Sequence, residues 1–193
     1  LGGSAVLASK APCKGLVAEY IETQKNQLAA LGVQVELNHA PTMAELRRLD
    51  PYGIFVTMGG QQIVPDIPGI DRENVFGIED VLLGRRAIEG REVAVIGGGH
   101  VGLEVAHFLC ANNKVTIVEM ADEIGASVYY ITKFKLLPLL REAGVTFRTG
   151  QAIAAVDDGS IRLRDTHTGQ CTELKAEAVG LAMGSRPDLA GAE

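Results

Sequence analysis

Apolar positions in residues 92–119 follow first a strand-like and then a helix-like spacing. Val93–Ile96 is a short, wholly apolar run rich in β-branched residues, typical of a strand buried on both faces of a parallel sheet. Apolar residues then recur at helical spacing through 99–110, and Lys114–Val118 has the composition of a second strand. The pattern predicts a strand–helix–strand unit in the middle of the chain.

The N-terminal part carries weaker periodicity. Lys14–Leu31 has one apolar stripe and ends at a glycine, which predicts a helix. Alternation over Val33–Leu37 predicts a strand, and the apolar run Ile54–Thr57 predicts a buried one. Between them Thr42–Leu49 predicts a short helix with a capping box formed by its first residue and Glu45. We further expect loops at 1–13 and 61–74, a short strand at 75–77 and one helical turn at 78–83.

The C-terminal part is dominated by predicted strands. Asp158-Gly159 joins two alternating runs and is a strong hairpin signal. Ile131–Ala143 predicts a helix, which Pro138 should kink or divide in two. The strands expected here are 145–149, 152–157, 160–165, 172–175 and 178–183, with a loop over 184–187. The fold class is therefore α/β: a Rossmann-like parallel sheet with a three-stranded antiparallel meander inserted before its last strand.

A glycine-rich motif joins the first central strand to its helix. Gly97, Gly99 and Gly102 have the G-x-G-x-x-G spacing that binds dinucleotides. The first glycine permits the tight turn, the second lets the backbone approach a pyrophosphate, and the third lets the helix pack on the strand. Glu119 ends the next strand about twenty residues later, where an acid binds ribose hydroxyls and repels a 2′-phosphate. The alternatives are a tight turn without a ligand and a solvated strand-end charge.

Charge and cysteine content narrow the function classes. The 193 residues suffice for one or two domains, and a formal net charge of −6 argues against nucleic acid or an acidic membrane surface as partner. Three widely spaced cysteines without a C-x-x-C pair argue against a disulfide framework, a zinc site and a redox dithiol. With no leader and no long apolar run, a cytoplasmic protein is expected. Because Leu1 is not a natural start, we expect a piece of a longer polypeptide.

Several stretches resemble one flavoprotein family. Val93–Glu104 is similar to an NAD-binding fingerprint, and Val56–Gly60 with Pro65–Ile70 is similar to the chain crossing of an FAD domain. Leu181–Pro187 is similar to the loop that closes the NAD domain, and Leu1-Gly2-Gly3 to the stretch just after the first nucleotide-binding strands. Together they resemble the C-terminal part of the NADH:flavin oxidoreductase and 2,4-dienoyl-CoA reductase family, which belongs to the glutathione-reductase-like flavoproteins with two dinucleotide domains.

The resemblance implies both an organisation and an activity. Residues 1–86 would be the distal part of an FAD-binding domain, and residues 87–193 an NAD(P)-binding domain. In the parent protein NADH would reduce FAD, and electrons would pass to FMN and an enoate or enoyl-thioester substrate, with FMN and an iron–sulfur cluster carried upstream. This piece alone is expected to be inactive. The alternatives are an NADH oxidase or another disulfide-independent pyridine nucleotide reductase, and a non-catalytic module that binds ADP or NAD.

The resemblance also implies candidate site residues. His100 could donate to the pyrophosphate or face solvent, and Glu104 could lie near the nicotinamide or only on the helix surface. Asp122 and Glu123 are interpreted as loop charges. No catalytic residue and no metal ligand is predicted. The expected NAD-binding residues are Gly97, Gly98, Gly99, His100, Val101, Gly102, Glu104, Glu119, Met120, Met183, Gly184 and Arg186, and Thr57 and Gly59 would touch FAD.

Overall fold

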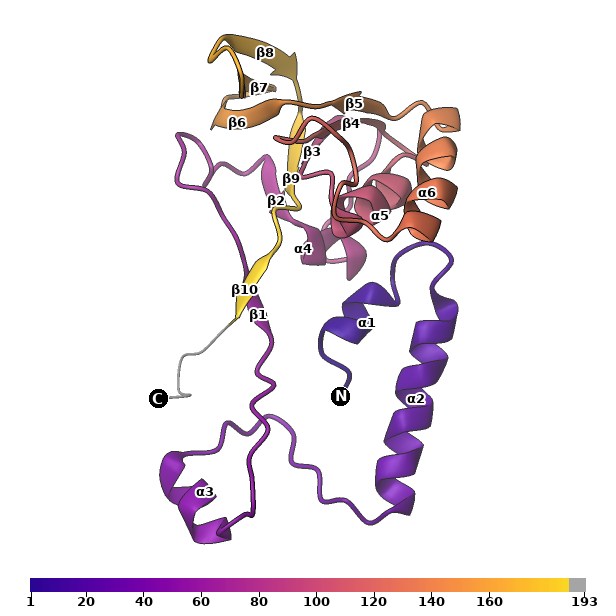
Figure 1. Cartoon of the computed structure of the whole chain (residues 1–193), viewed down its shortest axis with the longest axis vertical. Coiled ribbons are helices and arrows are strands. Elements are labelled where there is room, and N and C mark those ends of the chain that lie inside the picture. Colours follow the sequence, from indigo (N-terminus) through magenta and orange to yellow (C-terminus); the bar gives the residue numbers. More distant parts are fainter. Residues whose placement is uncertain (188–193) are drawn as a thin grey trace.

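The centre of the molecule is a five-stranded parallel sheet. The computed structural model describes residues 1–187. The strand order is β2-β9-β3-β4-β5, and every neighbouring pair is parallel. The predicted α/β fold with a Rossmann-like sheet is therefore confirmed (Figure 1). The strands are β2 (Val75–Gly77), β3 (Glu92–Ile96), β4 (Lys114–Val118), β5 (Thr146–Arg148) and β9 (Ala178–Leu181).

Each face of the sheet is covered by a different layer. Val93 and Val95 of β3 belong to a core formed with the helices, whereas Ala94 and Ile96 belong to a second core formed with the meander. This alternation explains why β3 is wholly apolar: both of its faces are buried. The helices are α4 (Ile78–Leu82), α5 (His100–Leu109) and α6 (Tyr130–Glu142), and the meander strands are β6 (Gln151–Val156), β7 (Ser160–Asp165) and β8 (Cys171–Lys175).

A second part of the chain extends away from the sheet. Figure 1 shows α3 far from the sheet, and β1 paired with β10 on the connection between them. The predicted capping box of α3 is present, with Thr42 and Glu45 exchanging hydrogen bonds. The elements are α1 (Ser4–Ala8), α2 (Gly15–Ala30), α3 (Met43–Leu49), β1 (Gly60–Gln62) and β10 (Ser185–Pro187).

Two predicted strands do not form. Val33–Leu37 and Ile54–Thr57 are irregular and exposed, and the Phe55 side chain is 95% exposed. A strand requires a neighbour that takes up its backbone hydrogen bonds, and within residues 1–187 neither segment pairs with one. The apolar pattern was therefore a correct sign of β propensity but not sufficient for a strand.

Some predicted loops are helix or strand instead. The stretch 1–13 contains the short helix α1, and β1 and β10 pair where loops were expected. Pro138 does not divide α6, which runs through it, and the kink stays a prediction. The hydrogen bond lost at Pro138 would end at the carbonyl of Phe134, and because both residues are exposed, water can replace it.

No helix within the described part of the chain is long and apolar enough to cross a bilayer.

We expect hydrogen exchange to separate the two parts of the chain. Amides of residues 34–37 and of Ile54–Thr57 should exchange close to random-coil rates, because the structure gives them no strand partner. Amides of β3 and β4 should exchange only on global unfolding. Exchange followed by mass spectrometry measures both in one sample. Protection at 33–37 equal to that of β3 would show that a strand forms there in solution.

Candidate functional site

The turn after β3 requires glycine at its first position. The N–H of Gly97 donates to the carbonyl of Val118 at 2.8 Å, which ties the turn to β4. Its φ is +110°, and an added Cβ would lie 2.4 Å from the carbonyl oxygen of Ala182 at the end of β9. Both the backbone conformation and the space therefore exclude a side chain.

Gly102 lets α5 approach the same turn. A Cβ at this position would lie 1.9 Å from the carbonyl oxygen of Gly97. That oxygen belongs to the backbone and cannot move without deforming the turn. The first turn of α5 is thus packed directly against the exit of β3, as the spacing of the motif predicts.

Gly99 faces an opening instead of a neighbour. It is the N-cap residue of α5, and the nearest atom to an added Cβ is the Ser127 hydroxyl at 3.9 Å. The first N–H groups of α5 have no intrahelical acceptor and lie at the positive end of the helix dipole. A dinucleotide's pyrophosphate fits such an opening, because the backbone itself supplies the donors.

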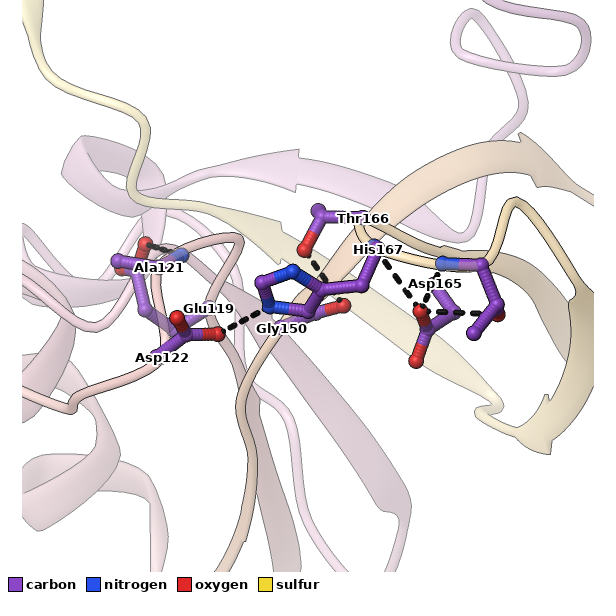
Figure 2. Close-up of polar contacts among 8 residues, drawn as sticks. Glu119, Ala121, Asp122, Gly150, Asp165, Thr166 and His167 are labelled. Atoms are coloured by element: carbon purple, nitrogen blue, oxygen red, sulfur yellow. Dashed lines mark hydrogen bonds and ion pairs between the residues drawn. The ribbon is translucent and has the colours of Figure 1, made fainter.

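Glu119 lies at the end of β4, beside the glycine turn. Its carboxylate accepts a hydrogen bond from the N–H of Gly98 at 2.6 Å. It accepts another from the N–H of Ala121 at 2.9 Å (Figure 2). These charge-assisted bonds fix the carboxylate at the sheet edge, and each oxygen keeps a lone pair for a further donor. The predicted strand-end acid is therefore oriented by backbone groups on both sides.

On the other side of the turn, Glu104 is part of a small ionic cluster. Its side chain is 14% exposed, pairs with the ammonium group of Lys14, and lies 2.8 Å from Nε2 of His100. Neither alternative considered for His100 included this pairing one turn along its own helix. Lys14 precedes α2, so the contact joins the N-terminal part of the chain to α5.

A cavity of about 300 Å³ adjoins this cluster. It is bounded by α1, α4, α5, β1 and the end of β9, and is lined by His100, Val101, Glu104 and Gly184 from the predicted set. Gln62, which was not predicted, also lines it and donates to the carbonyl of Leu181. The cavity and Glu119 thus lie on opposite sides of the glycine turn.

The remaining candidates do not gather there. Met183 is half-buried and packs against the core on the meander side, and Met120 is 64% exposed. Arg186 lies in β10, opposite Gln61 of β1. Thr57 and Gly59 lie in the exposed segment before β1.

Several contacts near the site join segments that are distant in the sequence and were not predicted. Lys14, Gln62 and the pair Asp122–His167 stand in no recognisable motif, so no local signal identifies them. Asp122, interpreted as a loop charge, lies 2.6 Å from Nε2 of His167. Within residues 1–187 no group of three or more histidine, cysteine, aspartate or glutamate side chains is placed to hold a metal ion.

Comparisons with known proteins agree with this geometry. Residues 34–193 match the family described as "Pyridine nucleotide-disulphide oxidoreductase". The chain is 30% identical over 191 residues to an NADH oxidase of Thermoanaerobacter brockii, covering 97% of this chain and 29% of the relative. It is 28% identical over 195 residues to a cinnamate reductase of Clostridium sporogenes, covering 98% of this chain and 29% of that protein.

One solved structure is similar to this chain in both fold and sequence. A complex of 2-naphthoyl-CoA reductase with 2-naphthoyl-CoA superimposes with a TM-score of 0.86 at 26% identity. The match covers 100% of this chain and 29% of that chain. The chain therefore spans less than a third of the length of the relatives it matches.

We expect Gly102→Ala to destabilise the fold strongly. The added methyl group would overlap the Gly97 carbonyl, so the free energy of unfolding should fall by about 3 kcal/mol or more. Gly15→Ala is the matched control: this glycine is also helical, and a Cβ there meets no atom within 4 Å. The control should keep or raise stability by up to about 1 kcal/mol. Urea denaturation followed by circular dichroism measures both variants, and equal midpoints would contradict the close packing.

Proposed function

The chain belongs to the pyridine nucleotide-disulphide oxidoreductase family, and from this premise we propose that it is the NADH-binding module of a flavin-dependent oxidoreductase. One observation carries the proposal: the opening above Gly99 lies at the N-terminus of α5, next to a strand-end carboxylate held by the turn itself. The family binds NAD(H) and FAD, and the relationship to an NADH oxidase supports NADH as the reductant.

In this proposal the adenosine ribose and the nicotinamide of NADH bind on opposite sides of the glycine turn. The N–H groups at the start of α5 bind the pyrophosphate, and Gly97 and Gly102 keep the backbone close enough for this. Glu119 accepts hydrogen bonds from the adenosine ribose hydroxyls. The nicotinamide enters the cavity beside Val101, Glu104 and Gly184, where Lys14 balances the charge of Glu104. Bound NADH supplies a hydride; the protein supplies binding and orientation.

We propose that the chain comprises parts of two domains. Residues 87–193 form the NAD-binding domain, to which β2 and α4 also contribute because β2 pairs with β9. Residues 1–86 are proposed as the distal part of an FAD domain, in which Thr57 and Gly59 approach the flavin. The unpaired segments Val33–Leu37 and Ile54–Thr57 support this, since strands from an FAD domain would supply the missing hydrogen-bond partners.

In the whole enzyme we propose that electrons pass from NADH to FAD, and then to FMN and an enoate or enoyl thioester. The relationship to a cinnamate reductase and a 2-naphthoyl-CoA reductase supports this substrate class. FMN and an iron–sulfur cluster would be bound by other parts of the parent protein. The relationship to an NADH oxidase favours a second candidate, in which FAD passes electrons to oxygen. Oxygen consumption by the whole protein without an enoate distinguishes the two.

The cysteines of this chain favour an electron-transfer route that does not use a disulfide. Cys13, Cys110 and Cys171 are free, and no disulfide is formed within the described residues. Burial raises the pKa of the Cys110 thiol, which disfavours the nucleophilic thiolate. The described residues therefore supply no disulfide as an electron acceptor for the flavin.

We expect Glu119→Gln to weaken NADH binding by about tenfold, because the variant loses the charge of a hydrogen-bonded acceptor. NADPH binding should not weaken, since the variant removes a charge that repels the 2′-phosphate. Wild-type protein should bind NADH more tightly than NADPH. Titration calorimetry measures all of these affinities.

Glu123→Gln is the matched control for this variant. Glu123 is an exposed acid of the same loop and pairs with Lys133. Its affinity for NADH should stay within about twofold of wild type. Equal affinities for NADH and NADPH, or unchanged NADH binding in Glu119→Gln, would show that Glu119 is only a strand-end charge.

We also expect the 193-residue chain, purified alone, to carry no stoichiometric FAD and to show no NADH oxidation. Thr57 and Gly59 are exposed and offer a flavin too few contacts, and the free cysteines provide no alternative electron acceptor. Two measurements test this: flavin absorbance after extensive dialysis, and NADH oxidation with an added enoate. One FAD per chain, or steady turnover by flavin-free protein, would contradict it.

A further inference from the structure

The loop that carries Glu119 is hydrogen-bonded to the β5–β6 turn, which is in turn hydrogen-bonded to the β7–β8 turn. The carbonyl of Glu119 accepts from the N–H of Gln151 at 3.0 Å, and the carbonyl of Ala121 accepts from the N–H of Gly150 at 2.9 Å. The carbonyl of Gly150 in turn accepts from the N–H of Thr166 at 2.8 Å and from its hydroxyl at 3.0 Å. The β4 exit, the β5–β6 turn and the β7–β8 turn therefore form one connected unit (Figure 2).

A side-chain pair closes this unit at the surface. Figure 2 shows the His167 ring directed at Asp122, with Nε2 and Oδ1 2.6 Å apart. The backbone of His167 is held as well, because its N–H donates to the Asp165 carboxylate at 3.0 Å. Gly150 lies directly beside the pair: an added Cβ would be in contact with Asp122 Oδ1 at 3.4 Å. Asp122 follows directly after Ala121, whose N–H holds the carboxylate of Glu119.

We propose that His167 is a positioning residue for the adenosine ribose of the coenzyme: through Asp122 it holds loop 119–122 in the conformation that presents Glu119. The proposal rests on the proposed function, since it assumes that Glu119 binds the ribose. His167 need not touch the coenzyme itself. It positions Glu119 indirectly: His167 holds Asp122, and the neighbouring Ala121 N–H holds the Glu119 carboxylate.

The charges around the ring make this positioning pH-dependent. The hydrogen bond and the charge of Asp122 raise the pKa of His167, and the nearby Asp165 adds to the effect. A raised pKa means that the ionic pair is fully formed below the ordinary pKa of histidine and is lost as the pH rises through the raised value. Of the other charges on this loop, Glu119 is bound by backbone N–H groups and Glu123 is paired with Lys133.

The test is the pH dependence of NADH affinity, measured by calorimetry on the 193-residue chain between about pH 5.5 and 9. Wild-type affinity should fall by about two- to fivefold as His167 loses its proton, which is the range for an exposed ion pair. His167→Gln should bind at the weaker, high-pH level throughout and lack this step. His100 is unchanged in every variant, so any effect it has is common to all of the profiles.

Two further variants separate the mechanisms. Asp122→Asn keeps the histidine but removes its partner, and it should also lack the step. His39→Gln is the matched control, because His39 is an exposed histidine within 3.5 Å of Glu45 at the distant helix α3. It should follow the wild-type profile. Circular dichroism checks that each variant is folded.

Each remaining outcome contradicts a specific claim. A wild-type profile in His167→Gln would overturn the proposal. A step that persists in Asp122→Asn would show that His167 acts by its own charge on the coenzyme and not by positioning the loop. Failure of wild-type protein to bind NADH at any pH would instead refute the proposed function, on which the inference rests.

Discussion

The site depends on one close approach of three backbone segments. The carbonyl of Gly97 lies where a Cβ of Gly102 would be, and the carbonyl of Ala182 lies where a Cβ of Gly97 would be. The end of β3, the first turn of α5 and the end of β9 meet there without intervening side chains. The N-terminus of α5 is consequently held at the sheet edge with its free N–H groups beside the opening at Gly99.

The order of the strands determines what surrounds this point. From β3 the chain continues to β4 on one side, while β9 lies on the other, so the glycine turn stands where the strand order reverses. Ligands of open α/β sheets bind at such positions. Glu119 follows the end of β4 on one side of the glycine turn. Gly184 and the cavity beside Glu104 lie on the other side. A dinucleotide crossing the turn would contact both.

Sequence patterns predicted the central elements, whose apolar residues are buried by other parts of the same chain. β3, α5 and β4 were recognised because each buries apolar residues in a core that the same chain completes. Val33–Leu37 has an equally clear alternation, but no described segment pairs with it as a neighbouring strand. The glycines and Glu119 could be identified because backbone geometry fixes their spacing. Lys14, Gln62 and His167 could not, since folding alone brings them beside Glu104, Leu181 and Asp122.

The most direct test is to locate bound NADH by nuclear magnetic resonance. Amide resonances of a ¹⁵N-labelled chain would be followed as NADH is added. We expect the largest saturable shifts at Gly99, His100 and Val101, where the backbone meets the pyrophosphate, and smaller ones at Glu119 and Gly184 on either side. Saturable shifts confined to residues outside the glycine turn, or no shifts at all, would contradict the assignment of this turn as the coenzyme site.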